Sequence, residues 1–230
     1  MSFREEVELH YTDPEGMITQ VRDPAEKWTS GNHLLILGTY HAILAHLGLG
    51  ISRDAIDFAA AVRPCEVEPG LYNRNAGRKD KQAHDDYIGV VAGSVACGAA
   101  FHKDVLSYGE SHFWIFDNDG QFLIGDCFFR HPGLVPFFRA SNGQKLCVFS
   151  QVTFSLSLLW NSFTNKDATS GVILRWLQIQ VMGGKHWLID RAIAFWKKRM
   201  MVKYPGGMGE VFAIYYGSGH PFAAAMLGRV

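Results

Sequence analysis

The stretch His84-Asp85-Asp86-Tyr87 brings together four side chains that can transfer protons, bind a metal or form hydrogen bonds. It stands where a polar segment meets a very apolar one. Carboxylates are favoured there if a helix begins at this point, because the amino-terminal end of a helix attracts negative charge. Two interpretations follow: a catalytic cluster completed by groups from elsewhere in the chain, or an aspartate that caps a helix while His84 lies in solvent.

A second group follows at Tyr108-Gly109-Glu110-Ser111-His112-Phe113-Trp114. A tyrosine, an acid, a histidine and a tryptophan at a helix end are typical of the wall of a sugar site, where a ring stacks on the sugar and polar groups fix its hydroxyls. The alternative is an aromatic corner of the core with two exposed polar residues. The catalytic residues of the site hypothesis are His84, Asp85, Asp86, Tyr108 and His112, and its binding residues are His33, His41, Glu110 and Trp114.

His33 and His41 lie in an apolar stretch that predicts a helix. At eight residues apart they are separated by about 80° around the helix axis and roughly 12 Å along it. Both can therefore point into one cleft, but a single metal ion cannot bridge them. The alternative is that each is a hydrogen-bonded core histidine. The sequence predicts neither a metal site nor a cofactor.

The charge balance excludes some classes of protein. Among 230 residues, Lys plus Arg and Asp plus Glu both number 22, so the formal net charge is zero. Proteins that hold nucleic acid or anionic membranes carry a basic field, so we expect neither partner. A net charge near zero favours self-association. We expect no signal peptide, no membrane span and buried free thiols at the four cysteines, and hence a soluble protein that is cytoplasmic or intracellular when synthesised.

The pattern of apolar residues predicts a mainly α fold. We expect an irregular arm over residues 1–32 and one helical domain over 33–230, built from stacked helix pairs as a toroid or an orthogonal bundle. Small residues from Gly89 to Ala100 predict a central helix with another helix very close to it. A polar loop is expected over 64–83 and a minor β-hairpin over 111–126, with Asp119-Gly120 as its turn. The predicted helices span about 33–47, 52–62 (capped by Ser52), 84–100, 168–182 and 186–203, while 145–163 fits a strand or a helix.

Helix pairs, many aromatic residues and Tyr, His and Asp side chains at helix ends are similar to the α/α-toroid glycan hydrolases and lyases. This resemblance implies that loops at helix ends line a sugar cleft where such side chains transfer protons. We therefore expect a glycan-directed hydrolase or lyase with a saccharide ligand.

Two other resemblances give alternatives. A compact, neutral, aromatic-rich helical protein also fits a non-catalytic structural or adaptor protein, for example of a phage particle and then located in the virion. Tyr204-Pro205-Gly206-Gly207-Met208 and Tyr215-Tyr216-Gly217 are similar to uncharacterised phage-encoded proteins, a resemblance that implies no activity. His84-Asp85, with a histidine upstream and aspartates downstream, resembles the HD-type metal-dependent phosphohydrolases. The sequence departs from that family because the doublet begins a segment of small apolar residues.

Overall fold

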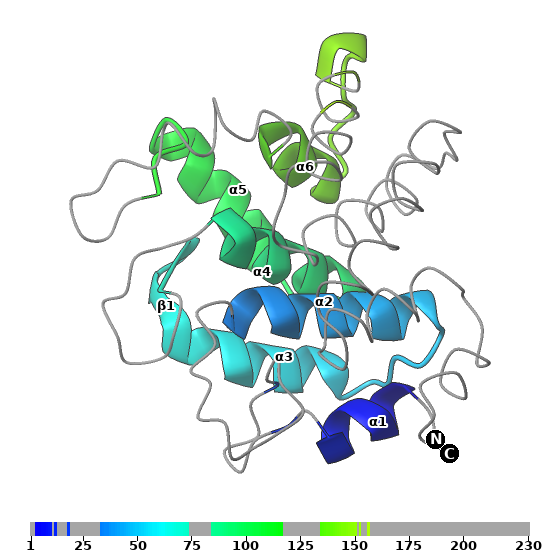
Figure 1. The fold of residues 1–230 in the computed structure, drawn as a ribbon. Helices are drawn as coiled ribbons and strands as arrows, with labels where there is room; N and C mark the ends of the chain where they lie inside the picture. Colours follow the sequence, from blue (N-terminus) through cyan, green and yellow to red (C-terminus); the bar gives the residue numbers. More distant parts are fainter. Residues whose placement is uncertain are drawn as a thin grey trace.

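A computed structural model describes residues 3–10, 12, 18, 33–73, 84–116, 134–150, 152 and 156. This part is mainly helical with a two-stranded antiparallel hairpin, which confirms the predicted fold class. Residues 148–150, 152 and 156 are helical as well. The labelled elements of Figure 1 are α1 (Phe3–His10), α2 (His33–His46), α3 (Asp54–Val62), the 3₁₀ helix η1 (Arg63–Cys65), β1 (Glu66–Glu68), β2 (Leu71–Tyr72), α4 (His84–Cys97), α5 (Phe101–Ser111) and α6 (Leu134–Ser141).

Helices α2 and α4 cross at backbone contact, and this crossing is the centre of the described part. A Cβ atom on Gly38 would overlap the backbone of Gly89, and one on Gly89 would overlap the backbone of Leu34 and Leu35. Glycine is the only residue that lets two helix backbones approach so closely. The prediction of a partner helix packed closely against the small residues of 84–100 is therefore confirmed.

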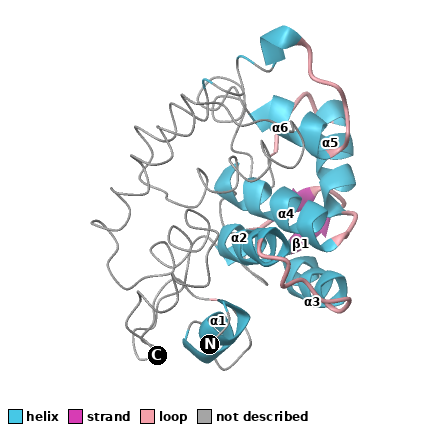
Figure 2. Cartoon of the chain, turned by 90° about the vertical axis from the view of Figure 1, so that its right-hand side faces the viewer, coloured by secondary structure: helices cyan, strands magenta, loops and turns pink. Residues whose placement is uncertain are grey.

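The other helices are arranged around this crossing. Figures 1 and 2 show α3 on one side of α2 and α4, with α5 and α6 on the other side. The ring of Phe58 from α3 fills the space left by Gly93, where a Cβ would overlap it. The buried core runs from α1 to α6, and its largest fully buried side chains include Tyr72, Tyr87, Phe116 and Phe137.

Residues 3–10 form a helix, although an irregular arm was predicted over 1–32. Val7 is fully buried, and Arg4 reaches across to α3. Its Nη2 atom lies 2.9 Å and 3.0 Å from the two carboxylate oxygens of Asp54, and it also donates to the carbonyl of Leu49 at 3.3 Å. Most of the remaining arm lies outside the described residues, apart from an isolated antiparallel bridge between Thr12 and Ile18.

The start of α3 differs from the prediction that Ser52 caps it. The helix begins at Asp54, and no side chain of its cap residue Arg53 bonds the first turn. Instead the carboxylate of Asp54 accepts the backbone N–H of Ile51 at 2.7 Å. The aspartate therefore orders the turn before the helix and binds Arg4 with the same group.

The hairpin lies in the segment predicted as a polar loop. β1 and β2 pair antiparallel around Pro69-Gly70, where Gly70 has φ of 89°. The predicted hairpin over 111–126 is wrong for its described part: α5 continues to Ser111 and residues 112–116 contain no strand. Residues 117–126 lie outside the described part. The aromatic and β-branched residues after α5, which predicted a strand, form a tight turn instead.

Helix α5 was not predicted as a separate element. The small-residue helix ends at Cys97, three residues before the predicted end, because Gly98 adopts φ of 77°. Phe101, Val105 and Tyr108 then recur at helical spacing and bury one face of α5. The ambiguous segment 145–163 is helical at its described residues from 148 onward, and the predicted helices 168–182 and 186–203 lie outside the described part.

The described residues contain no helix long and apolar enough to cross a membrane. Three of the four cysteines are described, all as free thiols. Cys65 is buried as predicted, and burial, with a smaller contribution from Asp86, raises the pKa of its thiol to about 11. Cys147 is exposed, so the prediction of a buried thiol is wrong there. Cys127 lies outside the described residues.

The α2–α4 crossing makes a first prediction. Gly38→Ala should destabilise the fold by about 3 kcal/mol or more, because the new methyl group overlaps a rigid backbone. Gly50→Ala is the matched control, since its Cβ would meet only the Asp54 carboxylate at 3.7 Å, and its effect should stay within about 1 kcal/mol. Urea unfolding of both variants gives the two values. Equal stability of the two variants would show that the helices do not meet as described.

The ion pair between α1 and α3 makes a second prediction. Asp54→Asn should lower the free energy of unfolding by about 2 kcal/mol or more, because it removes the nearest and buried counter-charge of the mostly buried Arg4 guanidinium and leaves it with the exposed carboxylate of Glu8 at 3.7 Å. Asp57→Asn on the same helix removes an exposed ion pair with Arg53 and should cost no more than about 1 kcal/mol. Thermal unfolding compares the two. A loss that is no larger for Asp54→Asn would contradict the placement of α1.

Candidate functional site

Two of the predicted catalytic residues, Tyr108 and His112, meet at the carboxyl end of α5. Their rings stack with centroids 4.0 Å apart and an angle of 13° between the planes. They lie four residues apart, one turn of the helix, and the backbone N–H of His112 donates to the carbonyl of Tyr108 at 2.9 Å. Tyr108 is buried whereas His112 is exposed. The buried ring therefore supports an imidazole that faces solvent.

The hydrogen bonds of His112 indicate which ring nitrogen carries the proton. Nδ1 lies 3.0 Å from the carbonyl oxygen of Tyr108 and 3.0 Å from Oγ of Ser111. The Ser111 hydroxyl itself donates to backbone carbonyls of α5. A carbonyl oxygen only accepts, so we assign the proton of the neutral ring to Nδ1. Nε2 is then the basic nitrogen, and His112 can act as a general base through it.

The turn after α5 has an uncommon backbone. Phe113 has φ of 54° and Trp114 has φ of 61°, so two consecutive non-glycine residues are left-handed. Such residues cost on the order of 1–3 kcal/mol each and are concentrated at functional sites. The turn leaves the side chain of Phe113 84% exposed and folds Trp114 back onto α5, where the backbone N–H of Trp114 donates to the carbonyl of Gly109 at 2.7 Å.

Trp114 is held in place by protein contacts. Its ring lies where a Cβ on Gly109 would overlap it, and it stacks on Phe138 of α6 with centroids 6.2 Å apart. The guanidinium of Arg139 lies 5.7 Å from the centre of the ring. The expected sugar-binding tryptophan thus packs the turn against α6. Among the described residues at this end, the exposed aromatic rings are those of His112 and Phe113.

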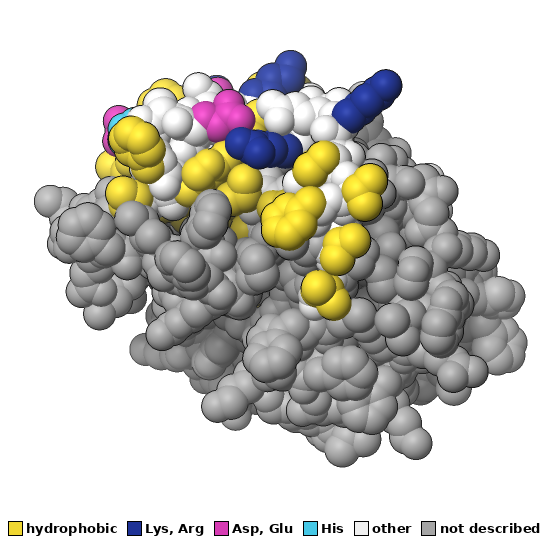
Figure 3. Space-filling view, turned by 90° about the horizontal axis from the view of Figure 1, so that it is seen from above, with side chains coloured by type: hydrophobic (Ala, Val, Ile, Leu, Met, Phe, Trp, Pro, Cys, Tyr) yellow, Lys and Arg dark blue, Asp and Glu magenta, His cyan; other side chains and the backbone are white. Residues whose placement is uncertain are grey.

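Glu110 also lies at this end of α5, half-exposed, with its carboxylate 3.7 Å from Nε of Arg139. The structure therefore brings four predicted residues together (Tyr108, Glu110, His112 and Trp114). It adds Arg139 from α6, and Phe113, which belongs to the same stretch but was not among the predicted site residues. Figure 3 shows basic, acidic and hydrophobic side chains lying next to each other on the face seen from above. Arg139 was missed because it lies 25 residues after Trp114, on a helix that was not predicted.

The first turn of α4 lies close to the same end of α5. The buried ring of Phe116 contacts Tyr87 at 4.5 Å and Tyr108 at 5.4 Å between centroids. Tyr87 in turn contacts Tyr72, whose backbone N–H donates to the Tyr87 hydroxyl at 3.3 Å. A layer of aromatic rings thus joins the two groups of residues that the sequence singled out.

In the stretch His84-Asp85-Asp86-Tyr87, the side chain of Asp86 does not lie at the surface. This side chain is 2% exposed, and it lies near enough to Cys65 for its charge to contribute to the raised pKa of that thiol. The Asp86 carboxylate, which was predicted to be catalytic, is therefore buried in the core. His84 and Asp85 begin α4, but their side chains lie outside what the structure describes. Within the described residues no group of three or more His, Cys, Asp or Glu side chains is placed to hold a metal ion.

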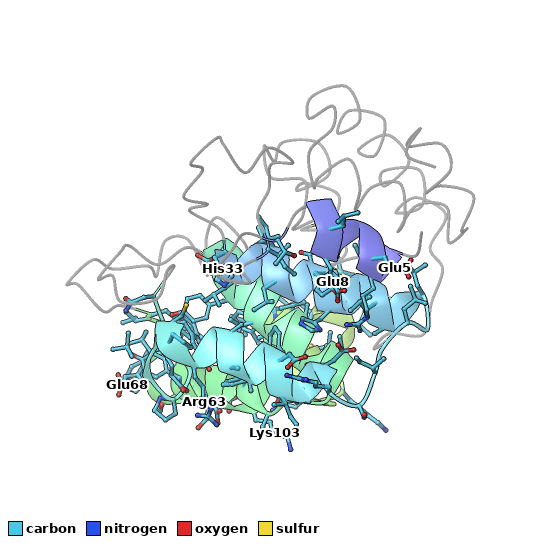
Figure 4. All side chains as sticks on the ribbon, turned by 90° about the horizontal axis from the view of Figure 1, so that it is seen from below. Glu5, Glu8, His33, Arg63, Glu68 and Lys103 are labelled. Atoms are coloured by element: carbon cyan, nitrogen blue, oxygen red, sulfur yellow. The ribbon has the colours of Figure 1, made fainter. Side chains whose placement is uncertain are left out.

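Two of the three histidines of α2, His33 and His41, are core residues. His33 is 3% exposed and His41 is 5% exposed. Figure 4 shows His33 near the start of α2. His41 contacts the rings of Tyr40 at 5.1 Å and Phe58 at 5.2 Å. Burial lowers the pKa of His41 to about 4; the charge of Asp54 raises it and that of Arg4 lowers it, both by less, so the ring is neutral at pH 7. Neither histidine belongs to the exposed group on α5.

A serine and a histidine also meet where α4 is joined to α5. Oγ of Ser94 lies 2.9 Å from Nδ1 of His102, as in a nucleophile and its base. The hydroxyl of Ser94 is, however, fully buried; it donates to the carbonyl of Ala99 and accepts the backbone N–H of His102. Its bonding capacity is used within the protein, and the pair fixes the angle between α4 and α5.

Comparison of the chain with protein-family models, with curated proteins and with solved structures finds no match.

The buried His41 makes a prediction about pH. Its folded-state pKa of about 4 lies below the ordinary 6.5, so the unfolded chain binds the proton more readily. The contribution of the neutral ring to stability is complete above pH 6.5. As the pH falls it is lost, and the loss of unfolding free energy reaches about 3 kcal/mol near pH 4. His41→Phe keeps the ring contacts and should reduce the loss of unfolding free energy between pH 7 and pH 5.

The control for this measurement is His112→Gln, which alters an exposed histidine and should retain the loss seen in the unchanged protein. Burial also lowers the pKa of His102, and that contribution, of the same sign, is present in all three proteins. An unchanged pH dependence in His41→Phe would contradict the buried neutral state of His41.

Proposed function

We propose that the chain is a glycan-directed hydrolase or lyase whose saccharide ligand binds at the carboxyl end of α5. The observation that supports this most strongly is the left-handed turn at Phe113 and Trp114, which directly follows the exposed imidazole of His112 and leaves the phenyl ring of Phe113 in solvent. Strain of this kind persists only where the surrounding structure enforces it, and it points to a function for the side chains that it positions.

The side chains fit the chemistry of a sugar. The exposed ring of Phe113 offers an apolar face to the C–H groups of the pyranose, while Glu110 and His112 offer hydrogen bonds to its hydroxyls. His112 transfers the proton through Nε2, and the buried ring of Tyr108 fixes the orientation of the imidazole. Glu110 provides a carboxylate within the same two turns of helix. These roles differ from the sequence hypothesis, which counted His84, Asp85 and Asp86 among the catalytic residues.

The proposal predicts that both exposed rings are needed. In a screen of polysaccharides with the full chain, Phe113→Ala should weaken saccharide binding about tenfold by removing the stacking ring. His112→Ala should lower the rate on the same substrate by about 100-fold or more, because general acid–base catalysis contributes at least that much. Binding is measured by calorimetry and the rate by release of reducing ends or of unsaturated sugar.

Phe149→Ala is the matched control, because Phe149 is a phenylalanine of similar exposure, 76%, on another helix. It should bind and turn over the saccharide like the unchanged protein. Equal effects of Phe113→Ala and Phe149→Ala would remove the end of α5 as the site. Saccharide binding without turnover would reduce the proposal to a glycan-binding protein.

A second candidate function is that of a non-catalytic structural or adaptor protein, for example of a phage particle. It is favoured by the exposed apolar side chains of Val148, Phe149, Val152 and Leu156, which are 77%, 76%, 50% and 57% exposed. Their helical spacing places them within about 100° of one another around one helix, so they share a face. Under this function Phe149→Ala weakens association with a partner protein or another copy of the chain, whereas His112→Ala does not.

A further inference from the structure

Arg139 retains its hydrogen-bonding capacity beside the proposed saccharide site. Within the described part of the chain its guanidinium makes two contacts, one with the Trp114 ring and one with the Glu110 carboxylate. The carboxylate is 3.7 Å from Nε, too far for a hydrogen bond. Nε is buried and has no hydrogen-bond partner among the described residues. Because Nε is buried, a ligand can meet only the remaining atoms of the side chain, which as a whole is 43% exposed.

A second arginine shows which of these features is distinctive. The guanidinium of Arg63 also lies over an aromatic ring, that of Phe101 at 5.8 Å, and its Nη1 is also 3.7 Å from a carboxylate, that of Glu66. Figure 4 shows Arg63 at the edge of the molecule seen from below, where Lys103 and Glu68 are also labelled. The contacts alone therefore do not mark a site. Arg139 differs in being less exposed, 43% against 70% for Arg63, and in its place beside the left-handed turn at Phe113 and Trp114.

We infer that the saccharide bound at the end of α5 is acidic, and that Arg139 binds its carboxylate or sulfate group. This inference rests on the proposed function. A guanidinium forms two parallel hydrogen bonds with such oxygens, and these charge-assisted bonds are shorter and stronger than those to neutral hydroxyls. The ring of Trp114 and its packing on Phe138 keep the side chain of Arg139 in place, so little conformational freedom remains to be lost on binding.

Glu110 has a defined part in this arrangement. Its exposed ion pair with Arg139 contributes little to stability, because both groups are about half in water. An anionic group of the ligand therefore competes with a weak partner and is repelled by the same carboxylate. Removing the charge of Glu110 and removing that of Arg139 should then change the affinity for an acidic saccharide in opposite directions.

The test measures binding of an oligogalacturonate, of its carboxyl-reduced neutral counterpart and of a sulfated neutral oligosaccharide to the full chain by calorimetry. We expect the unchanged protein to bind at least one of the two acidic ligands about tenfold or more tightly than the neutral one. Arg139→Gln should abolish that preference and Glu110→Gln should increase it. Arg63→Gln, the matched arginine control, should leave it unchanged. Which acidic ligand binds identifies the anionic group.

Equal binding of acidic and neutral ligands, or a preference that survives Arg139→Gln, would overturn the inference and leave the proposed function intact. A preference lost equally in Arg63→Gln would also overturn it, since it would then reflect the overall field of the protein. Arg139→Lys keeps the charge without the two-pronged geometry and should retain part of the preference, which separates a binding role from a folding defect. No binding of any saccharide would contradict the proposed function itself.

Discussion

The close crossing of α2 and α4 is the constraint on which the other elements depend. Gly38 and Gly89 meet backbone to backbone, so the two axes can be neither further apart without leaving a void nor closer without a clash. Gly93 lies on α4 like Gly89, and the ring of Phe58 from α3 occupies the space beside it. The Ser94–His102 contacts then fix α5 to the far end of α4. The position of the exposed group on α5 thus follows, through α4, from the glycines of the crossing.

The end of α5 combines rigidity with exposure. Behind the turn, the rings of Tyr87, Phe116 and Tyr108 form a buried aromatic layer, and Trp114 is held against Gly109 and Phe138. These contacts stabilise two left-handed residues that would relax if the turn were free in water. His112 lies on this layer through its stacking on Tyr108, while the side chain of Phe113 is 84% exposed. A turn whose strain is balanced by the core while its side chains face outward is well suited to bind a ligand without reorganising.

The sequence predicted the helices that are defined by strong punctuation. The start of α2 at His33 and of α4 at His84, and the end of α2 before Gly48, agree with prediction because caps and glycines act locally. The close partner of α4 was predicted from its small residues alone. The location of the hairpin was not, because Phe113-Trp114-Ile115-Phe116 has strand composition, whereas its conformation is set by packing on Gly109 and Phe138.

The candidate site was predicted in part for the same reason. Tyr108, Glu110 and His112 are neighbours on one helix end, so their proximity is a local property of the chain. Arg139 reaches them only through the contact between α5 and α6, which no local pattern encodes. Asp86 was placed correctly at the beginning of a helix, but the direction of its side chain depends on how closely α4 packs in the core. Residue types thus identified the candidates, and tertiary packing decided which of them face solvent.

The most direct test of the account is an NMR titration of the isotope-labelled chain with the best-binding saccharide. The account predicts that the backbone signals of residues 110–114 and the guanidinium signal of Arg139 shift together and saturate at the same ligand concentration. The indole signal of Trp114 should shift with them because its ring contacts that guanidinium. Shifts confined to other residues, such as 148–156, or no shifts with any saccharide, would contradict a ligand site at the end of α5.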